Sequence, residues 1–533
     1  TVREGILEWN KAFEKIGFTN ALVVKEQPDT ATWDAGDIRY NVLRWTSSPE
    51  PPFGGYGPSF VDPRTGQILG ADIMLEFIFV TNRMREQEIF QTAGMGYMAM
   101  SEEELMRGRD RCLFATDMHN ELMFGNAVLD GMGLGEAEKS RFLKEALMDL
   151  TLHELGHTLG LNHNMKASSI HTPEQLRDRA FTDAHSITGS VMDYTPSNLP
   201  AQPTDNVSYF ETEPGPYDDW AIAYGYTWMA DAGVEAVKVK KVLAASTDPE
   251  HIFGNDADDM RSPGNGIDPR VMIFDNSSDP VAYGIQVMDL ADRTLKGLMQ
   301  RYGTGDRSHE ELLTAYLWCT GRKFNAANVM TRQIGGIYVD RSFAGQQTPN
   351  APFTPVPLAT QKKAMAALAK YAFAPDAFQA GGELFDHLQR QRRGFEHWGV
   401  NEDPRVHDRV LFAQQAMLVH LLHANTLRRL VDSERYGNGY KLGEYMTELT
   451  DACFAADKAG AVNSFRQNLQ HAYVDRLVQV MDPAGAYREH ARSMAIFELD
   501  RIRKGLVLGV PDKGTMAHRA AIKLKIDRAL AVR

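Results

Sequence analysis

The sequence of 533 residues contains few cysteines and no long apolar run. Its three cysteines, Cys112, Cys319 and Cys453, are far apart and form no CxxC pair. The sequence therefore predicts neither a disulfide framework nor a cysteine-bound zinc site. At most one disulfide bridge could form. A transmembrane helix needs about 18 or more consecutive apolar residues, and no such run is present.

The chain also shows no secretory signal or lipid-anchoring sequence at its start. It opens with Thr1-Val2-Arg3-Glu4 and has no initiator methionine. Neither a charged leader followed by an apolar stretch nor a small-residue cleavage site is present. We expect the chain to be a fragment or a processed form, with any export signal or inhibitory segment lying upstream.

An excess of basic charge is missing too, because the formal net charge is −13. Nucleic acids and anionic membranes favour a basic surface, so neither is expected as the main partner. With 43% hydrophobic and 24% charged residues, the composition is that of a soluble globular protein. This length predicts two or more domains.

The most informative segment present is His153-Glu154-Leu155-Gly156-His157-Thr158-Leu159-Gly160-Leu161-Asn162-His163, an HExxHxxGxxH pattern. On a helix, His153 and His157 lie one turn apart and reach the same ion. Glu154 beside them is placed to take a proton from zinc-bound water. Gly160 allows a sharp exit that brings His163 round as third ligand. The sequence thus predicts one catalytic zinc ion with an open fourth position.

Downstream, Ser190-Val191-Met192-Asp193-Tyr194 adds a methionine followed closely by a tyrosine. With this addition the chain resembles the metzincin clan of zinc peptidases, in which a methionine turn follows the long zinc motif. The resemblance implies that Met192 forms the hydrophobic floor of the site. It also implies that Tyr194 lies near the zinc and stabilises the oxyanion.

Three segments narrow the resemblance to the bacterial Met-zincin metalloproteases. They are the zinc motif with its continuation to residue 168, Asp62-Pro63-Arg64-Thr65-Gly66-Gln67-Ile68-Leu69, and Pro216-Tyr217-Asp218-Asp219-Trp220-Ala221-Ile222. This resemblance implies a peptidase with a zinc cofactor and a peptide or protein substrate. It also implies a secreted, periplasmic or cell-surface location.

The predicted fold class is α+β, with a metzincin-like catalytic domain over residues 1–228. Strands are predicted over residues 21–24, 38–43 and 68–75, and a zinc helix over 141–159. The resemblance to metzincins implies that these strands form a twisted mixed sheet packed on the helix. In the metzincin clan the strand before the zinc helix is an edge strand that pairs with substrate. This implies substrate binding by Gly70, Ala71, Asp72 and Ile73, within the strand from Gly70 to Glu76. The alternative is an edge protected by its own loops.

Residues 229–533 are predicted to form a mainly α-helical C-terminal domain, and 343–357, rich in proline and glycine, an internal linker. Apolar residues recur at helical intervals over 285–302, 310–330, 360–371, 405–431, 442–456, 464–481, 486–504 and 518–530.

Two further groups of residues contain potential metal ligands. Asn255-Asp256-Ala257-Asp258-Asp259 offers acidic oxygens to calcium, but it lacks the ligand spacing of an EF-hand, and a solvated turn is favoured. His171 and His185 are expected to be surface or loop residues, since the zinc already has three histidines.

The predicted function is that of a zinc-dependent metalloendopeptidase with Glu154 as general base. One alternative is a hydrolase of narrow specificity that acts on short peptides or non-protein amides. A second is a binding or scaffold protein in which zinc only stabilises the fold. The sequence does not define the natural substrate or the oligomeric state.

Overall fold

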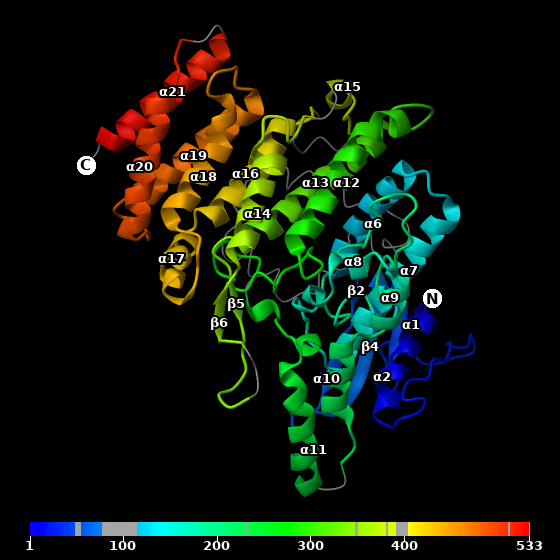
Figure 1. Cartoon of the computed structure of the whole chain (residues 1–533). Coiled ribbons are helices and arrows are strands. Elements are labelled where there is room, and N and C mark those ends of the chain that lie inside the picture. The colour runs from blue at the N-terminus through cyan, green and yellow to red at the C-terminus, as the bar shows by residue number, and fades with distance from the viewer. Residues whose placement is uncertain are drawn as a thin grey trace.

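The computed structural model describes residues 1–47, 55–76, 114–229, 232–258, 260–346, 350–379, 382–390, 403–509 and 512–531. Its first part combines helices with a small sheet, and its second part is almost entirely helical (Figure 1). This agrees with the predicted order of a mixed region followed by a helical region. Whether the two regions are separate domains that meet near residue 228 stays a prediction.

The sheet lies in the first part of the chain. Its strands are β1 (Val42–Thr46), β2 (Gly55–Tyr56), β3 (Ser59–Val61) and β4 (Ile68–Glu76). β1 runs parallel to β4, with Val42 opposite Asp72, while β2 and β3 pair with β4 in the antiparallel sense. The sheet is therefore mixed, as predicted. The strand predicted over residues 21–24 is wrong, because that segment lies outside the sheet.

The position of β4 corrects one prediction from the sequence. The strand order is β1-β4-β2, and β3 also pairs with β4. Gly70 and Ala71 are opposite Phe60 and Ser59, while Asp72 and Ile73 are opposite residues of β1. The main-chain groups of β4 are thus used by the protein's own strands. The prediction that β4 is an edge strand is therefore wrong, while substrate binding by Gly70, Ala71, Asp72 and Ile73 stays a prediction.

The first part of the chain also contains several helices. They are α1 (Val2–Glu8), α2 (Asn10–Lys15), α6 (Phe114–Gly131), α7 (Glu136–Thr158), α8 (Pro173–Leu176), α9 (Arg179–His185), α10 (Pro216–Tyr226) and α11 (Ala232–Ala244). Of these, α6 and α7 contact the sheet. The long helix α7 contacts α1, α6, β2 and β4. Two carboxylates in its first turn, Glu136 and Glu138, lie at the positive end of the helix dipole and stabilise the helix. Packing on several sides holds α7 rigidly in the fold.

The second part of the chain forms a row of packed helices (Figure 1). They are α12 (Pro280–Tyr302), α13 (His309–Gln333), α14 (Leu358–Leu368), α15 (Gly382–Phe385), α16 (Val406–Leu421), α17 (Ala424–Asp432), α18 (Leu442–Phe454), α19 (Ser464–Met481), α20 (Glu489–Gly505) and α21 (Lys513–Ala531). The predicted helical segments are confirmed, although the segment over 405–431 is divided into α16 and α17. Within the described residues, none of the helices is both long and apolar enough to cross a membrane.

Buried side chains of the helical row complete the apolar core of the first part. Leu290 on α12 and Cys319 and Val329 on α13 are buried in the same cluster as Leu152 and Met192. Between α13 and α14 in the sequence, β5 (Ile337–Val339) and β6 (Phe353–Pro355) form an antiparallel pair. β6 falls inside the segment predicted to be a linker, and that role stays a prediction.

Candidate metal centre

The three histidines of the zinc motif converge at the end of α7. The rings of His153 and His157 are 4.9 Å apart between centroids, and the ring of His163 lies 5.4 Å and 4.7 Å from them. One ligand atom from each lies within 4.8 Å of the others, so together they could hold a metal ion.

The turn after α7 brings His163 to the other two. Gly160 has a φ of +92°, which is the left-handed conformation that glycine adopts at low cost. The backbone N–H of Leu161 donates to the carbonyl of Gly156, and that of Gly160 to the carbonyl of His157, both at 3.0 Å. These two bonds define a Schellman motif, which satisfies carbonyls at the helix end while the chain reverses. The predicted sharp exit from the helix at Gly160 is confirmed, while the role of His163 as third zinc ligand stays a prediction.

Each histidine has its Nδ1 atom next to a different acceptor. Nδ1 of His153 lies 2.7 Å from the carbonyl oxygen of Val191, and Nδ1 of His157 lies 3.1 Å from that of Leu161. Nδ1 of His163 lies 2.5 Å from a carboxylate oxygen of Asp256. A proton on Nδ1 in each ring would leave the lone pair of Nε2 for a metal ion.

Burial keeps two of these rings neutral. It lowers the pKa of His153 well below the ordinary value, with a further contribution from His157 and His163. Burial also lowers the pKa of His157 to about 4, helped by the charge of His163. The Nε2 atom of His157 is buried and has no hydrogen-bond partner among the described residues. A buried, neutral imidazole nitrogen with no partner fits zinc, for which imidazole is a preferred ligand.

Glu154 lies under the backbone of strand β2 and the residue that follows it. The side chain is 0% exposed. A Cβ atom on Gly55 would lie 2.5 Å from Oε1 of Glu154, and one on Gly57 would lie 2.4 Å from its backbone oxygen. Only residues without a Cβ atom can approach this closely, so the two glycines allow the backbone to cover the carboxylate.

The segment from Ser190 to Tyr194 packs below the same helix. A Cβ atom on Gly156 would lie 2.4 Å from the sulfur of Met192, which places the methionine side chain against α7. The hydroxyl group of Tyr194 lies 3.3 Å from Nε2 of His163. The structure thus brings Met192 and Tyr194 to the histidines, while their roles as floor and oxyanion partner stay predictions.

A buried carboxylate anchors this segment. Asp218, near the start of α10, accepts hydrogen bonds from the hydroxyl group of Ser190 at 2.6 Å and from the N–H groups of Val191 and Gly215, both at 2.9 Å. Because the carbonyl of Val191 is the acceptor for His153, Asp218 fixes a residue that orients a histidine. In the sequence, Asp218 stands out only as part of a segment that resembles the Met-zincin family.

The carboxylate beside His163 is not predicted from the sequence. Asp256, in the short 3-10 helix η4 (Asp256–Asp258), belongs to the acidic loop considered for calcium. Asp256 contacts His163 and Arg261, and Asp258 contacts Arg341. Among the described residues, the only group suited to holding a metal ion is the three histidines. The suggestion of a calcium site in this loop gains no support. The pairing of Asp256 with His163 could not be predicted because the two residues are far apart in the sequence.

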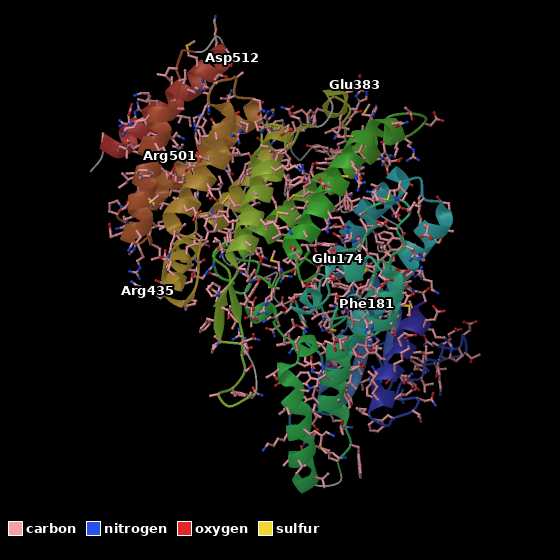
Figure 2. All side chains as sticks on the ribbon, viewed as in Figure 1. Glu174, Phe181, Glu383, Arg435, Arg501 and Asp512 are labelled. Atoms are coloured by element: carbon pink, nitrogen blue, oxygen red, sulfur yellow. The ribbon has the colours of Figure 1, made fainter. Side chains whose placement is uncertain are left out.

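The other histidines and the cysteines of interest lie apart from this group. The rings of His171 and His185 pack on Phe181 of α9, which Figure 2 labels, at centroid distances of 5.0 Å and 4.6 Å. Cys319 and Cys453 are buried free thiols. Cys112 falls outside the residues that the structure describes.

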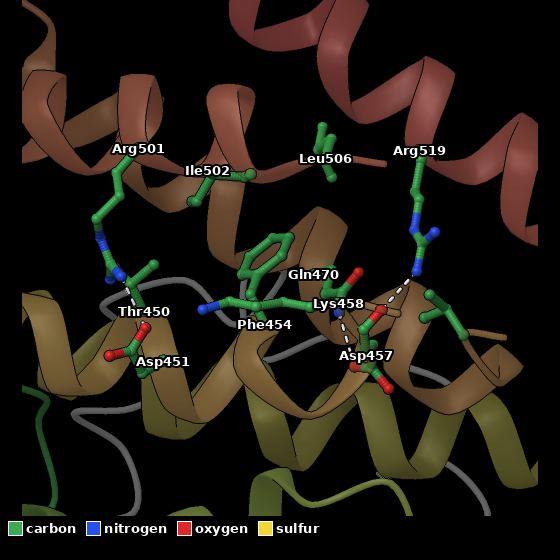
Figure 3. A pocket seen from close by; sticks show the side chains of 12 residues that line it. Thr450, Asp451, Phe454, Asp457, Lys458, Gln470, Arg501, Ile502, Leu506 and Arg519 are labelled. Atoms are coloured by element: carbon green, nitrogen blue, oxygen red, sulfur yellow. Dashed lines mark hydrogen bonds and ion pairs between the residues drawn. The ribbon is translucent and has the colours of Figure 1, made fainter. Parts of the chain in front are cut away.

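A separate cavity of about 200 Å³ lies among the helices α18 to α21 (Figure 3). Its charged groups are largely engaged within the protein. Arg501 pairs with Asp451 at 2.7 Å, and the guanidinium of Arg519 donates to the carbonyls of Asp457 and Gly460. The cavity therefore shows no convergent set of chemical groups like that at the end of α7.

The chain belongs to the Met-zincin family, because the model of that family matches residues 135–460, more than half of the sequence. The match covers the three histidines, Glu154, the segment with Met192 and Tyr194, and Asp256. No curated protein and no solved structure gave a significant match to the chain.

Proposed function

We propose that the chain is a zinc-dependent endopeptidase that hydrolyses peptide bonds with Glu154 as general base. The observation that carries this proposal is the convergence of three histidines, each with its Nδ1 atom beside an acceptor, next to a buried glutamate. The Met-zincin family supports the same activity. Three protein ligands leave a coordination position open, as catalytic zinc sites do.

In this proposal His153, His157 and His163 hold the ion through their Nε2 atoms. Zinc, when bound, polarises the scissile carbonyl and lowers the pKa of water from about 15.7 toward about 7. Glu154 accepts the proton of the attacking water and passes it to the leaving amine. Its burial excludes bulk water from the carboxylate and strengthens its interaction with nearby charge. Tyr194 donates a hydrogen bond to the oxyanion, a contribution of about 2 to 4 kcal/mol.

The pairing of β4 favours a second candidate function. A long peptide would gain affinity by adding a strand beside the site, but the partners of β4 are already strands of the protein. The backbone of Gly55 and Gly57 also encloses Glu154. These observations favour a hydrolase of narrow specificity that acts on short peptides or similar amides.

A single pair of variants tests both candidates. Glu154→Gln is expected to bind about one zinc ion per chain and to lose at least about 100-fold in peptide turnover, since general base catalysis contributes 10²- to 10⁴-fold. Glu136→Gln, a matched change at an exposed position of the same helix, is expected to retain full turnover. The measurements are zinc content and cleavage of peptide libraries of graded length.

The outcomes separate the alternatives clearly. Cleavage limited to the shortest peptides would favour the narrow hydrolase. Tight zinc binding without any hydrolysis by the wild type would favour a scaffold protein in which zinc stabilises the fold. Full activity in Glu154→Gln would remove Glu154 from the mechanism. The extracytoplasmic location implied by the family resemblance stays a prediction.

A further inference from the structure

The third histidine differs from the other two in how it is held. His153 and His157 are on the rigid helix α7, whereas His163 lies in an irregular segment after the helix has ended. The acceptors beside His153 and His157 are backbone carbonyls, but the acceptor beside His163 is the carboxylate of Asp256. The orientation of the His163 ring thus depends on a charged side chain from a distant part of the chain.

Both oxygens of the Asp256 carboxylate have a partner. Oδ2 lies 2.5 Å from Nδ1 of His163, and Oδ1 accepts a hydrogen bond of 3.0 Å from the guanidinium of Arg261. The guanidinium carbon of Arg261 lies 5.8 Å from the ring centroid of Tyr194. Arg261 therefore links the support of a proposed metal ligand with the proposed oxyanion partner.

The loop that carries Asp256 is fixed on the residues that follow His163. The side-chain amide of Asn164 donates to the carbonyl of Ile252 at 2.9 Å, and the N–H of Gly254 donates to the side-chain oxygen of Asn164 at 3.2 Å. The N–H of Met165 donates to the carbonyl of Gly254 at 2.8 Å. These bonds hold the loop close to His163 without any contribution from the carboxylate of Asp256.

From this geometry we infer that Asp256 is a positioning residue of the metal centre, and that Arg261 fixes its carboxylate. The inference rests on the proposed function, since it assigns support to a proposed zinc ligand. Asp256 holds the proton of the His163 ring on Nδ1, so that the Nε2 lone pair faces the ion, and it makes that nitrogen a stronger donor. Removing a carboxylate in this role weakens metal affinity about 10- to 100-fold.

The test compares two aspartates of the same loop in the full-length chain. Asp256→Asn keeps the size of the side chain but removes its charge, and its zinc dissociation constant is expected to rise about 10- to 100-fold. Asp258→Asn makes the same change at a residue that pairs with Arg341 instead, and its zinc affinity should match that of the wild type. Affinity is measured by competition with a chromophoric chelator, and the fold of each variant is checked by thermal unfolding without metal.

A second readout separates positioning from a general loss of stability. In the cobalt-substituted protein, Asp256→Asn is expected to shift the visible absorption bands, because the donor strength of His163 changes. Arg261→Gln should weaken zinc binding in the same direction but by a smaller factor, because Asp256 keeps its contact with His163.

The outcomes for this inference differ from those for the proposed function. Wild-type affinity and an unchanged cobalt spectrum in Asp256→Asn would overturn the inference, even if the protein is an active peptidase. Weakened affinity in Asp256→Asn, with Asp258→Asn unchanged, would uphold it even if the wild type hydrolyses no peptide. A wild-type chain that binds no zinc would overturn both.

Discussion

Adding a single methyl group to the zinc helix, by Gly156→Ala, tests how closely Met192 packs against it. The new Cβ atom would lie 2.4 Å from the sulfur of Met192 and 3.2 Å from a ring carbon of Trp9. Both Met192 and Trp9 are 0% exposed. An ordinary contact is about 3.5 to 4.0 Å, so the sulfur must move by more than about 1 Å in a closely packed core.

Two opposing contributions set the size of the effect. Replacing glycine by alanine within a helix stabilises a protein by about 1 kcal/mol, whereas inserting an extra carbon into a packed core costs about 1 to 3 kcal/mol. The overlap with the sulfur exceeds 1 Å, so we expect the cost to prevail and the free energy of unfolding to fall by about 1 kcal/mol. With an unfolding entropy of about 2.1 cal/mol/K per residue, this corresponds to a fall in Tm of about 1 °C if the whole chain of 533 residues unfolds together.

The assay is thermal unfolding of the metal-free protein, with Gly225→Ala as matched control. Gly225 lies near the end of α10, where an added Cβ atom would meet no atom within 4 Å, so alanine there should be neutral or stabilising. The double variant Gly156→Ala with Met192→Ala should show less than the sum of the two separate losses, because the smaller side chain makes room for the methyl group. If Gly156→Ala is as stable as Gly225→Ala, Met192 does not pack beneath this part of the helix.

Three other predictions concern the site and its support. Gly57→Ala would bring a Cβ atom to 2.4 Å from the backbone oxygen of Glu154. We therefore expect a loss of about 1 to 3 kcal/mol in unfolding free energy together with lower peptide turnover. Unchanged values of both would contradict the close approach. NMR titration of the metal-free protein should give His157 a pKa of about 4, since burial favours the neutral ring, and a value near 6.5 would refute that burial. Burial raises the pKa of Asp218 to about 7, so the folded state binds this proton more tightly than the unfolded state does. The stability of the wild type relative to Asp218→Asn should therefore fall as the pH rises from 5 to 8. A relative stability that grows over this range would be inconsistent with the raised pKa.

The local features of the site could be predicted from the sequence because they depend on short-range geometry. Helical spacing predicts that His153 and His157 share one face, and a glycine at position 160 predicts the reversal that brings His163 to them. The helices of the second half were predictable for the same reason, since an apolar stripe repeats every few residues along the chain.

Features that depend on long-range contacts could not be predicted in this way. The strand order places β4 between β1 and β2, and no pattern within β4 itself shows which partners will pair with it. The contact between His163 and Asp256 joins residues 93 positions apart, and an acidic loop is equally consistent with a solvated turn. The glycines over Glu154 also gave no signal, because glycine is common in loops for many reasons.

The separate anchoring of the three histidines has a consequence for folding. The acceptor for His153 comes from 38 residues away along the chain and the acceptor for His163 from 93 residues away, so the complete set of ligands exists only after distant segments have come together. An ion that binds only the assembled set shifts the folding equilibrium by mass action, more strongly as free zinc increases. Bound zinc would therefore report late tertiary assembly, and a shortage of zinc would expose the chain to unfolding and degradation in addition to removing the proposed catalysis.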